Sequence, residues 1–200
     1  MARTIRVVEG DLTEGDALVL VNASNTNAML GTGVSGAIRR ACGRGYQKRL
    51  QEALQQRFGG AMEPGQVMIT DAGAHPKARW IAHVAVMDYR QGFTGGSYPT
   101  LAVLEAGCRN LWQAIEGIGT RPLSVAMVAL GAGTGNIGLR NSVEMACRTL
   151  KEHLAANPDS ALGDVTFYGY ELPEFVVTLE VVRGHFDVPL ECVPEELRKP

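Results

Sequence analysis

The octapeptide WIAHVAVM at residues 80–87 decides the fold class of this chain. It is apolar at almost every position, whereas a strand with one face in water alternates between apolar and polar residues. A continuous apolar strand of this kind belongs to a sheet that is covered on both faces. The octapeptide therefore predicts a central strand, with helices packed above and below its sheet.

Segments on either side of this strand alternate between strand-like and helical patterns. Further strands are expected at residues 4–9, 17–21, 66–70, 123–130 and 164–170. Helices are expected at residues 35–42, 46–58, 100–116, 140–155 and 172–182. The alternation predicts an α/β fold, a three-layer α/β/α sandwich around a mixed, mostly parallel sheet of about six or seven strands. We expect one domain over residues 1–188 and a C-terminal tail over residues 189–200.

Composition and charge exclude several classes of protein. The 200 residues carry a formal net charge of -2 and no run of Lys or Arg, so a nucleic-acid backbone is disfavoured as a partner. No apolar run is long enough to span a bilayer and residues 1–11 are too polar for a secretory signal, so we expect a cytoplasmic protein with no membrane partner. The cysteines and histidines lack zinc-site spacing, and neither a metal nor a cofactor is expected. The sequence does not determine the oligomeric state.

Three polar or glycine-rich segments each follow an expected strand. They are GDLT at residues 10–13, NASN at residues 22–25 leading to GTGVSG at residues 31–36, and GAGTGNIG at residues 131–138. Because ligands bind at the carboxyl ends of strands in open α/β sheets, we expect the three segments to converge. Glycine lets backbone N–H groups close around a phosphate, and a helix N-terminus favours negative charge. Two such loops suit a diphosphate.

The order of these segments resembles the macrodomain family over residues 6–186, nearly the whole chain. The matching motifs are GDLT, VNASN at residues 21–25, GVSGAI at 33–38 and TGNIG at 134–138, supported by PGQV at 64–67 and WIAHV at 80–84. The resemblance implies a mixed sheet between helical layers, in agreement with the pattern above. It also implies binding of ADP-ribose, free or attached to a protein, and a nucleic acid would be a partner only as a carrier of ADP-ribose.

The resemblance implies roles for single residues at the adenine end of the ligand. Asp11 corresponds to an acidic residue that accepts a hydrogen bond from the adenine amino group, and Leu12 offers its backbone beside it. The alternative is that Asp11 only caps the turn after Gly10. Tyr170 is the candidate for stacking on adenine, and Tyr168, on the same face by strand alternation, is the alternative.

Further roles follow at the diphosphate and the distal ribose. Asn25 corresponds to the Asn that holds the distal ribose and is the one candidate for a catalytic role, whereas Asn22 is expected to fix the loop backbone. Gly33, Val34 and Ser35 are expected to present N–H groups to one phosphate. The residues expected to wrap the other phosphate and the distal ribose are Thr134, Gly135, Asn136, Ile137 and Gly138.

The chain departs from the family's hydrolases in three places. Ser35 stands where hydrolases that remove mono-ADP-ribose from acidic side chains typically have an Asp, and a hydroxyl is a much weaker base. The strand at residues 81–87 has no Lys, which another hydrolase branch uses, and Ile137 replaces an aromatic residue. The sequence therefore favours a binding module. A hydrolase of ADP-ribosyl groups, or a phosphatase of ADP-ribose-1''-phosphate, with weak or noncanonical catalysis is the alternative, so enzymatic activity stays open.

Four other polar residues invite catalytic roles but have simpler interpretations. His83 interrupts an apolar strand and is expected to be a hydrogen-bonded core histidine. Asp88 and Arg90 open a polar loop, and Asp71 begins a turn. A Rossmann dehydrogenase and a P-loop NTPase are disfavoured, because the glycine motif of neither occurs in the required context.

Overall fold

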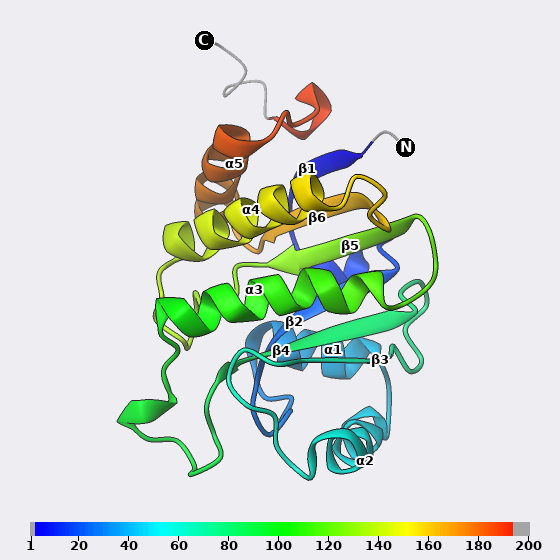
Figure 1. Cartoon of the computed structure of the whole chain (residues 1–200), viewed down its shortest axis with the longest axis vertical. Coiled ribbons are helices and arrows are strands. Elements are labelled where there is room, and N and C mark those ends of the chain that lie inside the picture. Colours follow the sequence, from blue (N-terminus) through cyan, green and yellow to red (C-terminus); the bar gives the residue numbers. More distant parts are fainter. Residues whose placement is uncertain (1–2, 194–200) are drawn as a thin grey trace.

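The computed structural model describes residues 3–193, in which a six-stranded sheet lies between two helical layers (Figure 1). Across the sheet the strand order is β1-β6-β5-β2-β4-β3. Neighbouring strands are parallel except at one edge, where β3 runs antiparallel to β4. The strands are β1 (Thr4–Glu9), β2 (Val19–Asn25), β3 (Val67–Asp71), β4 (Trp80–Met87), β5 (Leu123–Val128) and β6 (Leu162–Gly169). The predicted fold class is confirmed.

Helices cover both faces of the sheet (Figure 1). On one face lie α3 (Leu101–Glu116), α4 (Leu139–Ala156) and α5 (Leu172–His185), with α4 between the other two. On the other face lie α1 (Gly33–Ala41) and α2 (Tyr46–Phe58). Short 3-10 helices are η1 (Leu12–Glu14), η2 (Gly95–Ser97) and η3 (Leu190–Cys192). None of the helices within residues 3–193 has the length and apolar character needed to cross a membrane.

The two layers explain why residues 80–87 are apolar throughout. Successive side chains of a strand point to opposite faces of the sheet. Along β4, Ala82, Val84 and Val86 pack into the core beneath α3, α4 and α5, whereas Ile81 and Ala85 pack into the core beneath α1 and α2. All five side chains are buried, so both faces of this strand require apolar residues.

β2 extends further than the sequence predicts. Residues 17–21 were expected as the strand, yet β2 runs to Asn25, so both Asn22 and Asn25 lie within the strand and not after it. The ladder with β4 continues through this segment, with Asn22 opposite His83 and Asn25 opposite Met87. Pairing and burial along a central strand outweigh the weak strand propensity of Asn. This difference decides where the two Asn side chains point.

The C-terminal segment is ordered beyond the expected domain boundary. Leu190–Cys192 form η3 near β1, and the Val193 side chain is buried. Residues 194–200 of the expected tail lie outside the described residues. The boundary at residue 188 stays a prediction.

Candidate functional site

A cleft of about 630 Å³ opens where the parallel strands end. The three segments that the sequence singles out converge here, together with the ends of β4, β5 and β6. The cleft is lined by residues 10–12, Ala23, residues 31–35, Arg40, residues 86–87, 128–129 and 131–135, Leu139, Tyr168, Tyr170 and Glu174. Its position follows the rule that open α/β sheets bind ligands at the carboxyl ends of their strands.

The first glycine loop supplies free backbone donors at the start of α1. Within residues 3–193, the N–H groups of Gly33, Val34 and Ser35 have no hydrogen-bond acceptor. Gly33 adopts a φ of +58°, a conformation that glycine tolerates best, and the space beside its Cα is open. At Gly36 a Cβ would lie 2.8 Å from the carbonyl oxygen of Gly31, so only glycine fits there. The donors and the helix N-terminus together favour an anion.

The second glycine loop has a matching set of donors. The N–H groups of Gly133, Thr134 and Gly135 likewise find no acceptor in the described part of the chain. The loop closes on itself, because Asn136 N donates to Gly133 O at 3.0 Å and Ile137 N donates to Gly131 O at 3.1 Å. Two sets of N–H donors on residues that line one cleft have the chemistry that two phosphates require.

Only the first half of this loop lines the cleft. Thr134 and Gly135 do so, but Asn136, Ile137 and Gly138 are not among the lining residues. Asn136 has a φ of +54°, and Ile137 packs against the core beneath α3 and α4. These three residues belong to the loop but not to the lining of the cleft. Their predicted contact with a phosphate or ribose stays a prediction.

Asp11 also lines the cleft, and one of its carboxylate oxygens has hydrogen-bond partners among the described residues. Its Oδ1 accepts hydrogen bonds from Thr13 N at 2.9 Å and from Thr13 Oγ1 at 2.8 Å, which caps η1. Asp11 therefore caps η1 through Oδ1, and no described residue is a hydrogen-bond partner of Oδ2. The backbone N–H of Leu12 also lacks an acceptor among the described residues. One acceptor beside one donor is the pattern that the edge of adenine complements.

Both candidate tyrosines line the cleft, but they differ in exposure and packing. Tyr170 follows the end of β6 and is 66% exposed, and its backbone N–H donates to Glu174 Oε2 at 2.9 Å. Tyr168 is half-buried against the α1 and α2 layer, and burial raises the pKa of its hydroxyl. A Cβ on Gly15 would come within 2.2 Å of the Tyr168 hydroxyl oxygen, so the Tyr168 side chain packs closely against Gly15. Tyr170 has the more accessible ring for stacking.

Asn25 does not line the cleft. Its Oδ1 accepts from Asn27 N at 3.2 Å and from Met29 N at 3.1 Å, and its Nδ2 donates to Met29 O at 2.9 Å. The amide therefore holds the turn after β2 that leads to the first glycine loop. Its predicted contact with the distal ribose, and the catalytic role based on it, stay predictions.

Asn22 reaches the first glycine loop through the Ser35 hydroxyl and not, among the described residues, through a hydrogen bond to the loop backbone, because β2 continues through it and its side chain enters the core. Its Oδ1 accepts from the Ser35 hydroxyl at 2.8 Å, and its Nδ2 lies 3.1 Å from His83 Nδ1. The other ring nitrogen of His83 lies 3.1 Å from the Tyr46 hydroxyl and 3.2 Å from that of Thr70. Burial lowers the pKa of His83 to about 3, so the ring is neutral. The core histidine interpretation is confirmed.

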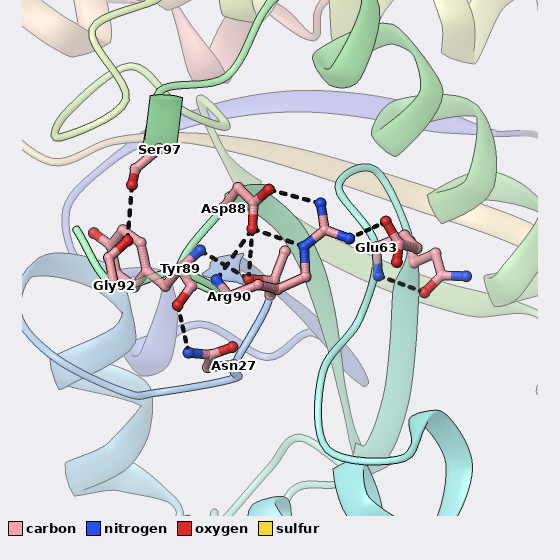
Figure 2. A network of polar contacts seen from close by, with 9 residues as sticks. Asn27, Glu63, Asp88, Tyr89, Arg90, Gly92 and Ser97 are labelled. Atoms are coloured by element: carbon pink, nitrogen blue, oxygen red, sulfur yellow. Dashed lines mark hydrogen bonds and ion pairs between the residues drawn. The ribbon is translucent and has the colours of Figure 1, made fainter. Parts of the chain in front are cut away.

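The polar loop after β4 forms its own network outside the cleft (Figure 2). The Arg90 guanidinium pairs with Asp88 at 2.7 Å and also with Glu63, and it lowers the pKa of Asp88 to about 2. Asn27 Nδ2 donates to Tyr89 O at 2.8 Å, which ties this loop to the turn after β2. The network is structural, since its charged groups are already paired.

Metal and thiol chemistry find no support in the described residues. No group of three or more His, Cys, Asp or Glu side chains within residues 3–193 is placed to hold a metal ion. Cys42, Cys108 and Cys147 are free and buried, and burial raises the pKa of Cys42 and Cys108 to about 12. A protonated, buried thiol is a poor nucleophile.

Sequence reasoning missed Arg40, the one basic residue among the described residues that line the cleft. It lies on α1 one turn after Gly36, with its guanidinium 3.5 Å from the position that a Gly36 Cβ would occupy. Helical spacing from the glycine motif could have identified it, because residues i and i+4 share a face. Its positive charge lies beside the free N–H groups of α1.

Comparison with known proteins agrees with this geometry. The model of the Macro domain family matches residues 21–146. A protein named O-acetyl-ADP-ribose deacetylase from Cronobacter sakazakii is 30% identical over 187 residues, covering 94% of this chain and 97% of the relative. The solved Oceanobacillus iheyensis macrodomain with ADP has a TM-score of 0.76 and 23% identity, covering 91% of each chain. The Trypanosoma brucei macrodomain in complex with ADP-ribose has a TM-score of 0.72 and 22% identity, covering 89% of this chain and 68% of that one.

Proposed function

This chain belongs to the macro domain family, and from that premise we propose that its cleft binds ADP-ribose, free or carried on a protein. The observation that carries the proposal is the pair of glycine loops, which line one cleft and whose N–H groups find no acceptor within residues 3–193. Fixed donors in this arrangement recognise a diphosphate through charge-assisted hydrogen bonds. Structures of similar fold were solved with ADP and with ADP-ribose.

Three regions of the cleft would hold the adenine, the diphosphate and the distal ribose. Adenine lies between Asp11 Oδ2, which accepts from its amino group, and the exposed ring of Tyr170, which stacks on it. The diphosphate lies between the two glycine loops with Arg40 beside it. The distal ribose then extends toward the ends of β2 and β4, where the Asn25 amide donates one Nδ2 hydrogen to Met29 O and has a second for a ribose hydroxyl.

A second candidate function is hydrolysis of an ester on the distal ribose. It is favoured by the relative named O-acetyl-ADP-ribose deacetylase, which matches nearly the whole chain. The cleft offers little general-base chemistry near the first glycine loop, because the Ser35 hydroxyl donates inward to Asn22 and carries no charge. A bound substrate with an ordered water could still react slowly through positioning alone. The same cleft could admit ADP-ribose-1''-phosphate.

The experiment is calorimetric titration with ADP-ribose and with ADP, followed by incubation with O-acetyl-ADP-ribose, ADP-ribose-1''-phosphate and a mono-ADP-ribosylated protein. Binding of both nucleotides without release of acetate, phosphate or protein is the expected result. Release at a rate that depends on an intact cleft would make the hydrolase the main function. Absence of binding to both nucleotides would overturn the proposal.

A further inference from the structure

A chain of buried polar side chains runs from the first glycine loop into the core beneath α1 and α2. It comprises Ser35 on α1, Asn22 on β2, His83 on β4, Tyr46 at the start of α2 and Thr70 on β3. Their exposed fractions range from 0% for Asn22 and His83 to 8% for Thr70. Polar groups buried to this degree are costly unless they are paired, and here each one is.

The hydrogen bonds of this chain have a direction. Asn22 Oδ1 accepts the proton of the Ser35 hydroxyl, so the Nδ2 of the same amide faces His83 Nδ1 and donates to it. The single proton of the neutral His83 ring then lies on Nε2, which donates toward the hydroxyl oxygens of Tyr46 and Thr70. Ala23 O, at 3.3 Å, is a second acceptor for Ser35. In either case the Ser35 proton is donated to β2 and is not free for a ligand.

We propose that Asn22 and His83 are positioning residues that act through Ser35. They hold its side chain against β2, and thereby hold the N–H groups of Gly33, Val34 and Ser35 in the geometry that meets a diphosphate. The inference rests on the proposed function for its ligand, but the chain of hydrogen bonds is a property of the folded protein. The Ser35 side chain is thus an anchor of the phosphate loop and not a base.

The test compares ADP with ADP-ribose, because both carry the diphosphate and only one carries the distal ribose. Ser35→Ala is expected to weaken both ligands by a similar factor of about ten, the size of one lost buried hydrogen bond. His83→Gln is expected to weaken both in the same sense, and adding it to Ser35→Ala is expected to cost little more, since the two act in one chain. Ser35→Thr, which keeps the hydroxyl, is expected to restore most of the affinity.

A matched control removes a buried hydroxyl far from the cleft. Thr149→Val breaks the hydrogen bond that Trp112 Nε1 donates to Thr149 Oγ1 at 3.1 Å, so it lowers stability without changing affinity. If Ser35→Ala behaved in the same way, the proposal would be wrong. A loss confined to ADP-ribose would also overturn it, because the hydroxyl would then touch the distal ribose directly.

A spectroscopic arm tests the chain without any ligand. Nitrogen-15 NMR of the imidazole is expected to find His83 neutral at pH 6–7 with its proton on Nε2. In Ser35→Asp the new carboxylate repels Asn22 Oδ1, so the amide is expected to turn over and the His83 proton to move to Nδ1. Rapid averaging between tautomers in the wild-type protein, or an unchanged tautomer in a folded Ser35→Asp, would contradict the proposed chain of hydrogen bonds. Failure of wild type to bind ADP would instead count against the proposed function alone.

Discussion

The two glycine loops present the same chemistry to the cleft but are held in place by different means. The first loop is anchored from outside, through the Ser35 hydroxyl and the polar side chains that extend from it to His83. The second loop is closed by its own backbone, and a Cβ on Gly135 would lie 2.6 Å from Gly131 O. The first loop should therefore be sensitive to distant core residues, whereas the second should be sensitive to its own glycines.

The largest effect is expected from Gly135→Val. No room exists for a Cβ beside the Gly131 backbone, so the loop must open, and its N–H groups no longer point toward the diphosphate. Affinity for ADP and for ADP-ribose should fall by more than about a hundredfold, an overpacking penalty of roughly 3 kcal/mol. Calorimetry measures this directly. Gly184→Ala on α5, outside the cleft, is the control, since nothing lies within 4 Å of its Cβ position, and equal damage from both variants would refute the closed-loop model.

The next largest effect is a pH dependence of stability that belongs to the first loop's anchor. Burial lowers the pKa of His83 from 6.5 to about 3, so below pH 6.5 the unfolded chain binds a proton that the folded chain excludes. Stability should therefore fall as the pH falls, by about 2 kcal/mol between pH 7 and pH 5. Urea midpoints across this range measure the slope.

The matched variant for this pH effect is His83→Gln, which removes the titrating group. It should flatten the dependence between pH 7 and pH 5. Asp88, whose pKa is lowered to about 2, contributes stability that is lost only below its ordinary pKa of 3.8, so it does not titrate in this window. A wild-type slope that persists unchanged in His83→Gln would assign the effect to another group.

A smaller effect is expected from Asp11→Ala, which touches neither loop. Losing the carboxylate should weaken ADP-ribose about tenfold and reduce its advantage over a pyrimidine analogue such as CDP-ribose. Competition titrations with both ligands measure the ratio. Thr13→Val is the control, because it removes one partner of Oδ1 and leaves the carboxylate in place. Equal weakening of both ligands would mean that Asp11 acts only as the cap of η1.

The smallest effect is expected from Asn136→Gly in the second loop. Its φ of +54° suits glycine, and the side chain does not line the cleft, so stability should change by less than about 1 kcal/mol and affinity should stay the same. Thermal unfolding and calorimetry test the two parts. A clear loss of affinity would show that Asn136 reaches the ligand and that the loop moves on binding.

The site was predictable where a role depends on backbone and local spacing. Three of the predicted donors, Gly33, Val34 and Ser35, line the cleft, and their N–H groups have no acceptor in the described part of the chain, because glycine spacing before a helix determines that geometry locally. Roles that depend on where a side chain points were less predictable. Asn25 lies within the extended β2 and its amide bonds to the turn that follows, so its predicted ribose contact stays a prediction.

The sequence by itself determined the layered fold and the positions of the two glycine loops, because burial periodicity and glycine spacing are properties of neighbouring residues. Only the tertiary structure decided that the second loop faces the cleft through Thr134 and Gly135 and turns Ile137 away. It alone also decided that Ser35 is tied through Asn22 to a histidine on another strand. Those contacts join segments far apart in the chain, and their hydrogen bonds exist only once α1, β2 and β4 have packed together.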